Sequence, residues 1–328
     1  NTEPGATVEY RSKLGTGSFS AWGSSYTAPA INGSADGAYV VEVRQIDTAG
    51  NASASQSVNF TLDTTTPATP DATLATDSGI SSTDGITNVG SVVAPSNTES
   101  GASVEYRVKR DSGAFGAWSK TYTAPATNGS ADGVYAVEVR QTDVAGNASA
   151  TQTRTFTLDT TAPAAAALAE QSTNDLSDSR MSAAEAVSTV FRVSLPTSGS
   201  LALAGDTVEL RIGGAAFATP KVVTLTGADV TLGYVSFTVA AADLGADGAK
   251  RLSAVITDVA GNAGRASESL SFTLDTIAPA APALAEQGSS DLADNRMNRL
   301  EATSTNFRVT LPTGGSLAVA GDTVELRI

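Results

Sequence analysis

The sequence predicts an all-β protein built from tandem β-sandwich domains in a linear array. Three observations predict this class of fold. Short sequence words recur in the same order along the chain, apolar and polar residues alternate within short runs, and Gly, Asp, Asn and Pro separate those runs. The words recur at intervals of about 100 residues, which is the size of one small sandwich domain.

Two recurring words divide the chain into four repeats. A Leu-Asp-Thr word with Pro three residues after the Thr occurs as LDTTTP, LDTTAP and LDTIAP, and the loop word D-x-A-G-N precedes each copy. Successive copies of the first word lie 96 and 116 residues apart, so two subtypes of repeat are present. We expect an incomplete domain at 1–66 that lacks its first strands, a complete domain of the 96-residue subtype at 67–162, a complete domain of the 116-residue subtype at 163–278, and first strands only at 279–328.

The local patterns favour strands throughout each repeat. Between residues 135 and 141, Tyr135, Val137, Val139 and Gln141 share one face of the predicted strand. The Ala-rich stretch 164–169 is expected to be a strand rather than a helix, because it follows a Pro and occupies the position of 68–74, which also has a strand pattern.

The Asp-Gly-x-Tyr word identifies the type of sandwich. Asp132-Gly133-Val134-Tyr135 resembles the corner before strand F of immunoglobulin-like domains, where a Tyr hydroxyl bonds back to nearby backbone. The first repeat has the same word, ending in Tyr39. The third repeat has Lys250 at the Tyr position, so we expect its corner to be built differently. The predicted fold is therefore a tandem array of immunoglobulin-like β-sandwiches.

Composition excludes several classes of function. The chain contains no His and no Cys, which removes Ser-His-Asp and Cys-His nucleophiles, thiolate and imidazole metal sites and disulfides. A formal net charge of −14 argues against nucleic-acid binding, and no apolar run is long enough to span a membrane. Paired carboxylates recur in every repeat, whereas a catalytic pair is usually made once, so the sequence does not predict an enzyme.

The recurring carboxylates make an oxygen-ligated cation the main candidate for a site. Strand alternation places Asp132 and Asp143 at opposite ends of one strand, so Asp77, Asp84, Asp132 and Asp159 should gather at the exit of the second repeat, facing Asp258 and Asn262 of the next one. Carboxylates so close would repel, and Ca²⁺, which takes six to eight oxygen ligands, would relieve that repulsion. The alternative is that these residues only favour turns.

The chain as a whole resembles a known family. The order D-x-A-G-N-x-S, strand, LDTTAP, together with DSGISSTDGIT at 77–87, resembles the bacterial Ig-like (BIg) tandem repeats of giant type I-secreted, biofilm-type surface adhesins. The resemblance implies calcium-rigidified stalks on the outside of a bacterial cell. It also implies a distal ligand-binding domain and a membrane-retention module elsewhere in the parent chain.

The resemblance extends to a differently spelled loop in the third and fourth repeats, NDLSDSRMSAAEA at 174–186 and SDLADNRMNRLEA at 290–302. Its D-x-x-D…E spacing is similar to a calcium-loop variant of such repeats, whereas the EF-hand pattern is missing. The full set of candidate Ca²⁺ ligands is Asp36, Asp47, Asn51, Asp63, Asp77, Asp84, Asp132, Asp143, Asn147, Asp159, Asp175, Asp178, Glu185, Asp247, Asp258, Asn262, Asp275, Asp291, Asp294 and Glu301.

Three functional hypotheses remain open at the sequence level. The first is an extracellular stalk segment whose partners are the neighbouring repeats of its own chain, with a host-surface or biofilm ligand bound by other domains. The second is a module that itself binds glycan or protein, with Trp22 and Trp118 as the stacking candidates, although these rings are expected to be core or half-buried. The third is a unit of a self-assembling filament or surface layer, built by strand exchange between the incomplete ends. We expect instead that the incomplete ends reflect a window on a longer repetitive chain, with a monomeric array.

Overall fold

The structure, a computed structural model, describes residues 3–171, 176–187, 189–287, 292, 295–303 and 305–327. Strands dominate these residues, which confirms the predicted all-β class. The chain forms two compact units, Asn1–Ala162 together with the loop Asp258–Asn262, and Pro163–Thr257 together with Ala263–Ile328.

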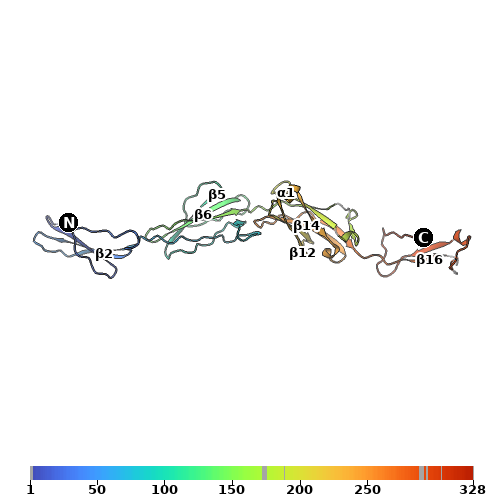
Figure 1. Cartoon of the computed structure of the whole chain (residues 1–328), viewed down its shortest axis with the longest axis horizontal. Coiled ribbons are helices and arrows are strands. Elements are labelled where there is room, and N and C mark those ends of the chain that lie inside the picture. The colour runs from blue at the N-terminus through green and yellow to red at the C-terminus, as the bar shows by residue number, and fades with distance from the viewer. Residues whose placement is uncertain are drawn as a thin grey trace. The chain divides into compact units, whose positions relative to one another are not determined.

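The first repeat contributes one antiparallel sheet, drawn in blue in Figure 1. Its strand order is β1 (Thr7–Leu14), β2 (Gly37–Ile46) and β3 (Gln56–Leu62). The ring of Tyr39 on β2 stacks on Phe60 of β3, with the ring centroids 5.3 Å apart. A pair of adjacent strands thus holds the same aromatic contact that recurs in the second repeat.

The second repeat is organised around a four-stranded sheet in which β5 and β6 pair along their whole length (Figure 1). The strand order is β4 (Ile86–Thr87), β7 (Gln152–Leu158), β6 (Gly133–Thr142) and β5 (Ser103–Arg110), with β4 parallel to β7. The segment 68–74, predicted as a strand, makes only the single bridges Asp71–Ser96 and Leu74–Val92. Pro70 lacks the N–H that a continuous ladder would need there.

The predicted alternation of β6 is confirmed. Tyr135, Val137 and Val139 are buried, and the first two belong to one cluster with Phe156 and Leu158 of β7. Gln141 on the same face is fully buried yet polar, and its amide is satisfied. Its Nε2 donates to the carbonyls of Ala68 and Asn97 at 2.7 and 2.8 Å, and its Oε1 accepts from the N–H of Glu99 at 2.8 Å. The side chain therefore pins two loops to the strand.

The third repeat shows the sandwich in full. Its five-stranded sheet has the order β12 (Ala215–Thr224), β11 (Thr207–Ile212), β14 (Gly248–Thr257), β15 (Leu270–Asp275) and β9 (Arg180–Ser182). The facing sheet has the order β13 (Tyr234–Val239), β10 (Thr189–Ser194) and β8 (Ala167–Glu170). The strand β8 confirms that the Ala-rich segment is not helical.

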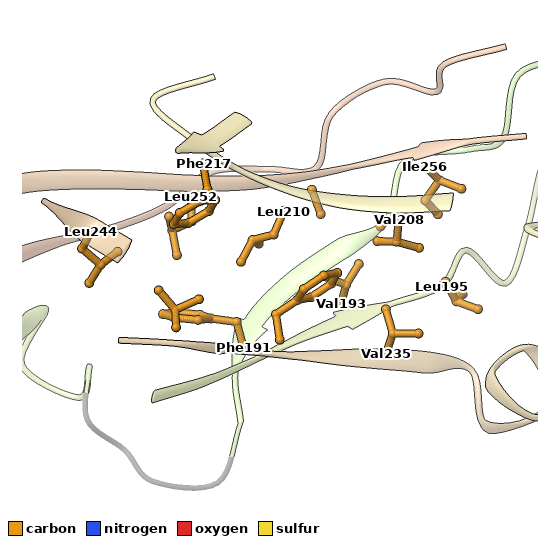
Figure 2. Close-up of a cluster of buried hydrophobic side chains, with 14 of the residues drawn as sticks. Phe191, Val193, Leu195, Val208, Leu210, Phe217, Val235, Leu244, Leu252 and Ile256 are labelled. Atoms are coloured by element: carbon orange, nitrogen blue, oxygen red, sulfur yellow. The ribbon is translucent and has the colours of Figure 1, made fainter. Parts of the chain in front are cut away.

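The core of this repeat lies between its two sheets. Figure 2 shows Phe191, Val193 and Val235 of one sheet pointing toward Leu210 and Leu252 of the other. All five side chains are at most 5% exposed, which is the burial that two packed inner faces produce. The immunoglobulin-like sandwich predicted from the sequence is thus built from residues that alternate along each strand.

Short helices add to the 116-residue subtype, and the sequence analysis did not predict them. They are the 3₁₀ helix η1 (Glu185–Val187) and the α-helices α1 (Gly227–Leu232) and α2 (Ala241–Leu244). A capping box starts α1, because Thr226 Oγ1 accepts from the N–H of Asp229 and Asp229 Oδ2 accepts from the N–H of Thr226. Gly233, with φ of 81°, ends the helix in the left-handed conformation.

The corner before strand F is the same in all three repeats that have it. The hydroxyls of Tyr39 and Tyr135 donate to the carbonyls of Ala35 and Ala131, four residues earlier, at 2.8 and 2.7 Å. In the third repeat the ammonium of Lys250 donates to the carbonyl of the residue at the equivalent place, Ala246. The expectation of a different corner was therefore wrong in its geometry, because a Lys side chain reaches the same carbonyl and supplies the same kind of donor.

The fourth repeat contributes the antiparallel pair β16 (Ala283–Gln287) and β17 (Asn306–Thr310), with the 3₁₀ helix η2 (Glu301–Thr303) between them. Over the residues that can be described, no helix has the length and apolar character needed to cross a lipid bilayer.

Candidate functional site

The D-x-A-G-N loop closes on itself in the same way in each copy. In the second repeat, Asp143 Oδ1 accepts from the backbone N–H of Asn147 at 2.8 Å, and Oδ2 accepts from the Asn147 side-chain amide at 2.8 Å. The copies at Asp47–Asn51 and Asp258–Asn262 make the same two bonds at 2.7 to 2.9 Å. The Asp of this loop is therefore a clamp that fixes the orientation of the Asn amide.

The Asn amide then donates its second N–H to another repeat. Asn147 Nδ2 lies 3.0 Å from the carbonyl oxygen of Asp63, and Asn262 Nδ2 lies 2.8 Å from that of Asp159. Both acceptors are the Asp of a Leu-Asp-Thr word, which we call the L-D-T end of a repeat. Both contacts lie inside the first compact unit, which includes the loop 258–262. We call each such meeting of a D-x-A-G-N loop and an L-D-T end a junction.

The second junction includes a further set of backbone contacts. Ser78 Oγ donates to the carbonyl of Ala260 at 2.8 Å, and the N–H of Ile80 donates to the carbonyl of Val259 at 3.2 Å. Gly79 has φ of 94°, and a Cβ there would lie 1.9 Å from the Val259 carbonyl oxygen. Only glycine permits this approach. The loop 77–87 thus reaches the D-x-A-G-N loop, as the strand alternation predicted.

A second kind of Asp clamp secures the L-D-T end itself. Asp132 accepts from the backbone N–H and hydroxyl of Thr160 at 3.0 and 2.7 Å, and from the hydroxyl of Thr161 at 2.6 Å. Asp36 accepts from Thr64 and Thr65, and Asp247 from Thr276, in the equivalent places. Sequence reasoning missed these Thr partners, although the Thr that follows each Leu-Asp is as regular as the Asp itself.

The hydrogen bonds lower the pKa of several of these carboxyls. Burial by itself would raise the pKa of Asp143 and Asp132. The bonds from Asn147 in the first case, and from Thr161 and Thr160 in the second, outweigh it, so both pKa values are lowered. The bond from Asn51 lowers the pKa of Asp47 in the first repeat. These carboxylates are ionised at neutral pH and already hydrogen-bonded.

Other candidate ligands accept backbone N–H groups from residues two to eight positions away. The acceptor and donor pairs are Asp63 with Thr65, Asp77 with Gly85, Asp84 with Ile86, Asp159 with Thr161, Asp178 with Arg180, Glu185 with Ser182, and Asp275 with Ile277. Asp175, Asp291 and Asp294 lie outside the described residues, and Glu301 begins η2. Every candidate carboxylate whose side chain can be described thus accepts a hydrogen bond, either within a loop or, for Asp36, Asp132 and Asp247, from a Thr of the L-D-T end.

Two observations at the second junction go beyond turn chemistry. The pKa of Asp159 is raised, first by burial and then by the charges of Asp258 and Asp132. Asp77 Oδ1 is buried and accepts no hydrogen bond from any part of the chain that the structure describes. A cation would relieve the repulsion and give this oxygen a partner. However, among the described residues no three acidic side chains are grouped closely enough to hold a metal ion. The donor set as arranged fits a calcium cage only in part.

Comparison with known proteins bears on the second repeat directly. Residues 65–160 match the family model described as a bacterial Ig-like domain. The second repeat is therefore similar to this family over nearly all of its length. The match begins one residue after Thr64 of the first L-D-T end and stops at Thr160 of the second, so the Ig-like domain includes both β6 and the D-x-A-G-N loop. The bacterial Ig-like resemblance predicted from the sequence words is confirmed for this repeat.

Solved structures that resemble the chain include tandem repeats of large bacterial adhesins. A tetra-tandem repeat from the extending region of a large adhesion protein is 20% identical, with 86% of this chain and 69% of that chain covered and a TM-score of 0.28. A structure from a 1.5-MDa bacterial ice-binding adhesin is also 20% identical, covering 83% and 87%, with a TM-score of 0.28. A Ca²⁺-stabilised adhesin of an Antarctic bacterium is 19% identical, covering 85% and 67%, with a TM-score of 0.31. No curated protein matches the chain.

Proposed function

We propose that this chain is a structural segment of an extracellular stalk on a bacterial surface, which projects a ligand-binding domain located elsewhere in the parent protein. The observation that carries the proposal is that two successive L-D-T ends receive the same donor, the Asn amide of the following D-x-A-G-N loop, at 3.0 and 2.8 Å. A contact that recurs from repeat to repeat suits a protein whose task is to extend. The bacterial Ig-like family of the second repeat supports the same role.

The role proposed here is structural rather than catalytic. The recurring carboxylates accept structural hydrogen bonds: Asp47, Asp143 and Asp258 within their own loops, and Asp36, Asp132 and Asp247 from a Thr of the L-D-T end. A general acid or base needs a carboxyl that can exchange its proton with a substrate, and the hydrogen bonds that lower the pKa of Asp47 and Asp143 do not favour this. The neighbouring repeats of the same chain are the expected partners.

We also propose that Ca²⁺ binds at the second junction and stiffens it. The raised pKa of Asp159 and the buried oxygen of Asp77 support a cation there, and Asp258 and Asp132 would supply charge. Bound calcium would neutralise these carboxylates, while their existing hydrogen bonds keep each one oriented. Three carboxylates within reach of one ion would require the loops to close further than they do here. The other candidate ligands, including Asp178 and Glu185, stay predictions.

The test is to compare the whole chain in millimolar calcium and in EDTA. Calcium is expected to narrow the distribution of chain dimensions in small-angle scattering, to raise the melting temperature and to slow proteolysis near Thr160–Pro163. Chelation should reverse all three effects. Identical scattering and melting curves under the two conditions would remove calcium from the mechanism. Light scattering at high concentration separates the stalk from the filament, since a monomer argues against assembly by strand exchange.

A further inference from the structure

The contact between repeats has a geometry that requires no metal. At the first junction the donor is the Asn147 amide and the acceptor is a peptide carbonyl, that of Asp63. Neither group carries a charge, so their hydrogen bond needs no neutralising ion. The Asp143 carboxylate is occupied in holding the same amide through its other N–H. One planar amide group therefore joins a clamp in its own loop to a carbonyl in the preceding repeat.

The second junction repeats this arrangement. Asn262 is held by Asp258 and donates to the carbonyl of Asp159. Asp143 and Asp258 are 7% and 5% exposed, so both clamps are shielded from water. A single hydrogen bond of this kind that was open to water would contribute little to stability. Two independent copies in one chain make a chance contact an inadequate explanation.

The first repeat provides an internal comparison. Asn51 is clamped by Asp47 with the same two bonds as the other copies. Its side chain is exposed and, within the described part of the chain, its amide donates to no L-D-T end. The clamp therefore forms without the contact between repeats, which means that the Asn amide is already oriented before it meets its acceptor. A preoriented donor loses less conformational entropy on binding.

The end of the third repeat has the features of the two occupied acceptors. Asp275 occupies the Asp position of its L-D-T word, and the adjacent Thr276 is clamped by Asp247 through its N–H and hydroxyl, both at 2.8 Å. This is the clamp that Asp132 makes with Thr160 and Asp36 with Thr64. The same local geometry thus presents a carbonyl at each of three L-D-T ends.

We propose that the Asn of the D-x-A-G-N loop is a metal-independent latch that docks on the L-D-T carbonyl of the preceding repeat, and that the L-D-T end of the third repeat is a site for the same loop of a further repeat. This inference rests on the proposed stalk function and deepens it. The latch recognises a short extended backbone segment through its Asp carbonyl. It fixes which end of one repeat meets which end of the next.

The test compares three single substitutions in the whole chain, Asn51→Ala, Asn147→Ala and Asn262→Ala. Hydrogen exchange followed by mass spectrometry reports on the two L-D-T ends, residues 62–66 and 158–162, in EDTA. Asn147→Ala should speed exchange of 62–66 roughly fivefold, the effect of losing one net hydrogen bond, and leave 158–162 unchanged. Asn262→Ala should do the reverse. Asn51→Ala, which removes only the clamp within the loop, should change neither segment.

The outcomes separate the latch from calcium. If Asn147→Ala and Asn262→Ala alter neither segment, or alter both equally, the latch is refuted. If Asn51→Ala has the same effect as Asn147→Ala at 62–66, the effect comes from the loop itself and the latch is again refuted. Repeating the series in calcium tests the metal separately. If calcium has no effect on the unsubstituted chain, calcium is removed from the proposed function, but the selective effects of Asn147→Ala and Asn262→Ala in EDTA still support the latch.

Discussion

At the scale of single residues, two neighbouring carboxyls of the second junction are tuned in opposite directions. The pKa of Asp132 is lowered, because the hydrogen bonds from Thr161 and Thr160 and the charge of Arg110 outweigh burial. The pKa of Asp159 is raised by burial and by the charges of Asp258 and Asp132. The ionised carboxylate of Asp132 therefore stabilises the fold, whereas the ionised carboxylate of Asp159 destabilises it.

These opposite shifts predict a stability maximum of the L-D-T end in mild acid. As pH falls from neutral through the raised pKa of Asp159, protonation removes its repulsion and exchange at 158–162 should slow. Below the ordinary Asp value of about 3.9, protonation of Asp132 releases Thr160 and Thr161, and exchange should accelerate. Both the slowing in mild acid and the acceleration at lower pH can be measured by hydrogen exchange at 158–162 as a function of pH in EDTA, after correction for the intrinsic exchange rate.

Two variants and one comparison test this prediction. Asp159→Asn should remove the slowing in mild acid, and Asp132→Asn should remove the acceleration at lower pH. The first repeat is the comparison. The pKa of Asp36 is lowered, first by the bond from Thr64 and then by that from Thr65, so exchange at its L-D-T end, residues 62–66, should only accelerate at low pH. An exchange profile at 158–162 that only accelerates as the acid increases, in the unsubstituted chain, would contradict the assignment.

The sequence could place these residues but could not give them their roles. Strand alternation put Asp132 and Asp143 at opposite ends of β6, and the contacts of Thr160 and Asn147 agree with that placement. Whether an Asp in a turn binds a cation or its own backbone depends on the direction of its carboxylate, and that direction is set by the side-chain rotamer. Residue type and spacing do not encode that direction.

At the scale of elements, the paired strands β5 and β6 carry a ladder of charges capped by an aromatic ring. Arg140 bonds Glu105 at 2.9 Å, and Arg107 bonds Glu138 across the same pair of strands. The guanidinium carbons of Arg140 and Arg107 lie 4.2 and 4.6 Å from the centre of the Trp118 ring. The first repeat has the same ladder around Trp22. The ring therefore packs over the two guanidinium groups on the face of the strand pair.

Replacing Trp118 by Ala should destabilise the second repeat without affecting glycan binding. The loss of two cation–π contacts and of partly buried ring area predicts a decrease of about 1–2 kcal/mol in the unfolding free energy of that repeat. Exchange of the β6 amides under conditions of global opening measures it, and Trp22→Ala serves as the matched control in the first repeat. Glycan-array binding by the unsubstituted chain that disappears in Trp118→Ala would instead favour the binding module.

The elements themselves were predictable to the extent that their signals were periodic. The alternation of β6 was recovered, because inner faces need an apolar residue at every second position, whereas β8 was recovered in part from the preceding Pro and its place in the repeat. The helices α1 and α2 were not, since each has at most six residues and no room for a 3.6-residue period. The Thr226 and Asp229 capping box, followed by Gly233, was the local signal that could have revealed α1.

At the scale of the whole molecule, charge and repetition act together. The chain carries a formal charge of −14 and no His, so protonation near neutral pH cannot reduce its self-repulsion. The latch holds each junction without charge, whereas the carboxylates around Asp159 oppose closure. Calcium would then act on a joint that is already aligned by Asn262, and its effect would be on stiffness rather than on the order of the repeats.

This division of roles predicts that calcium and ordinary salt differ in their effects. Sodium chloride at about 0.15 M screens exposed charges over a Debye length of about 8 Å, and this should weaken the repulsion between Asp159 and Asp258 only partly. A cation coordinated by Asp159 and its neighbours should act at far lower concentration and saturate. Small-angle scattering of the whole chain during calcium titration, against sodium chloride of matched ionic strength, should therefore show saturable stiffening only with calcium. Asp159→Asn removes one partner of this repulsion, so it should weaken the saturable calcium response and also reduce the small response to sodium. If matched sodium chloride reproduces the full effect, calcium acts by screening alone, and the junction is held by its hydrogen bonds without a metal site.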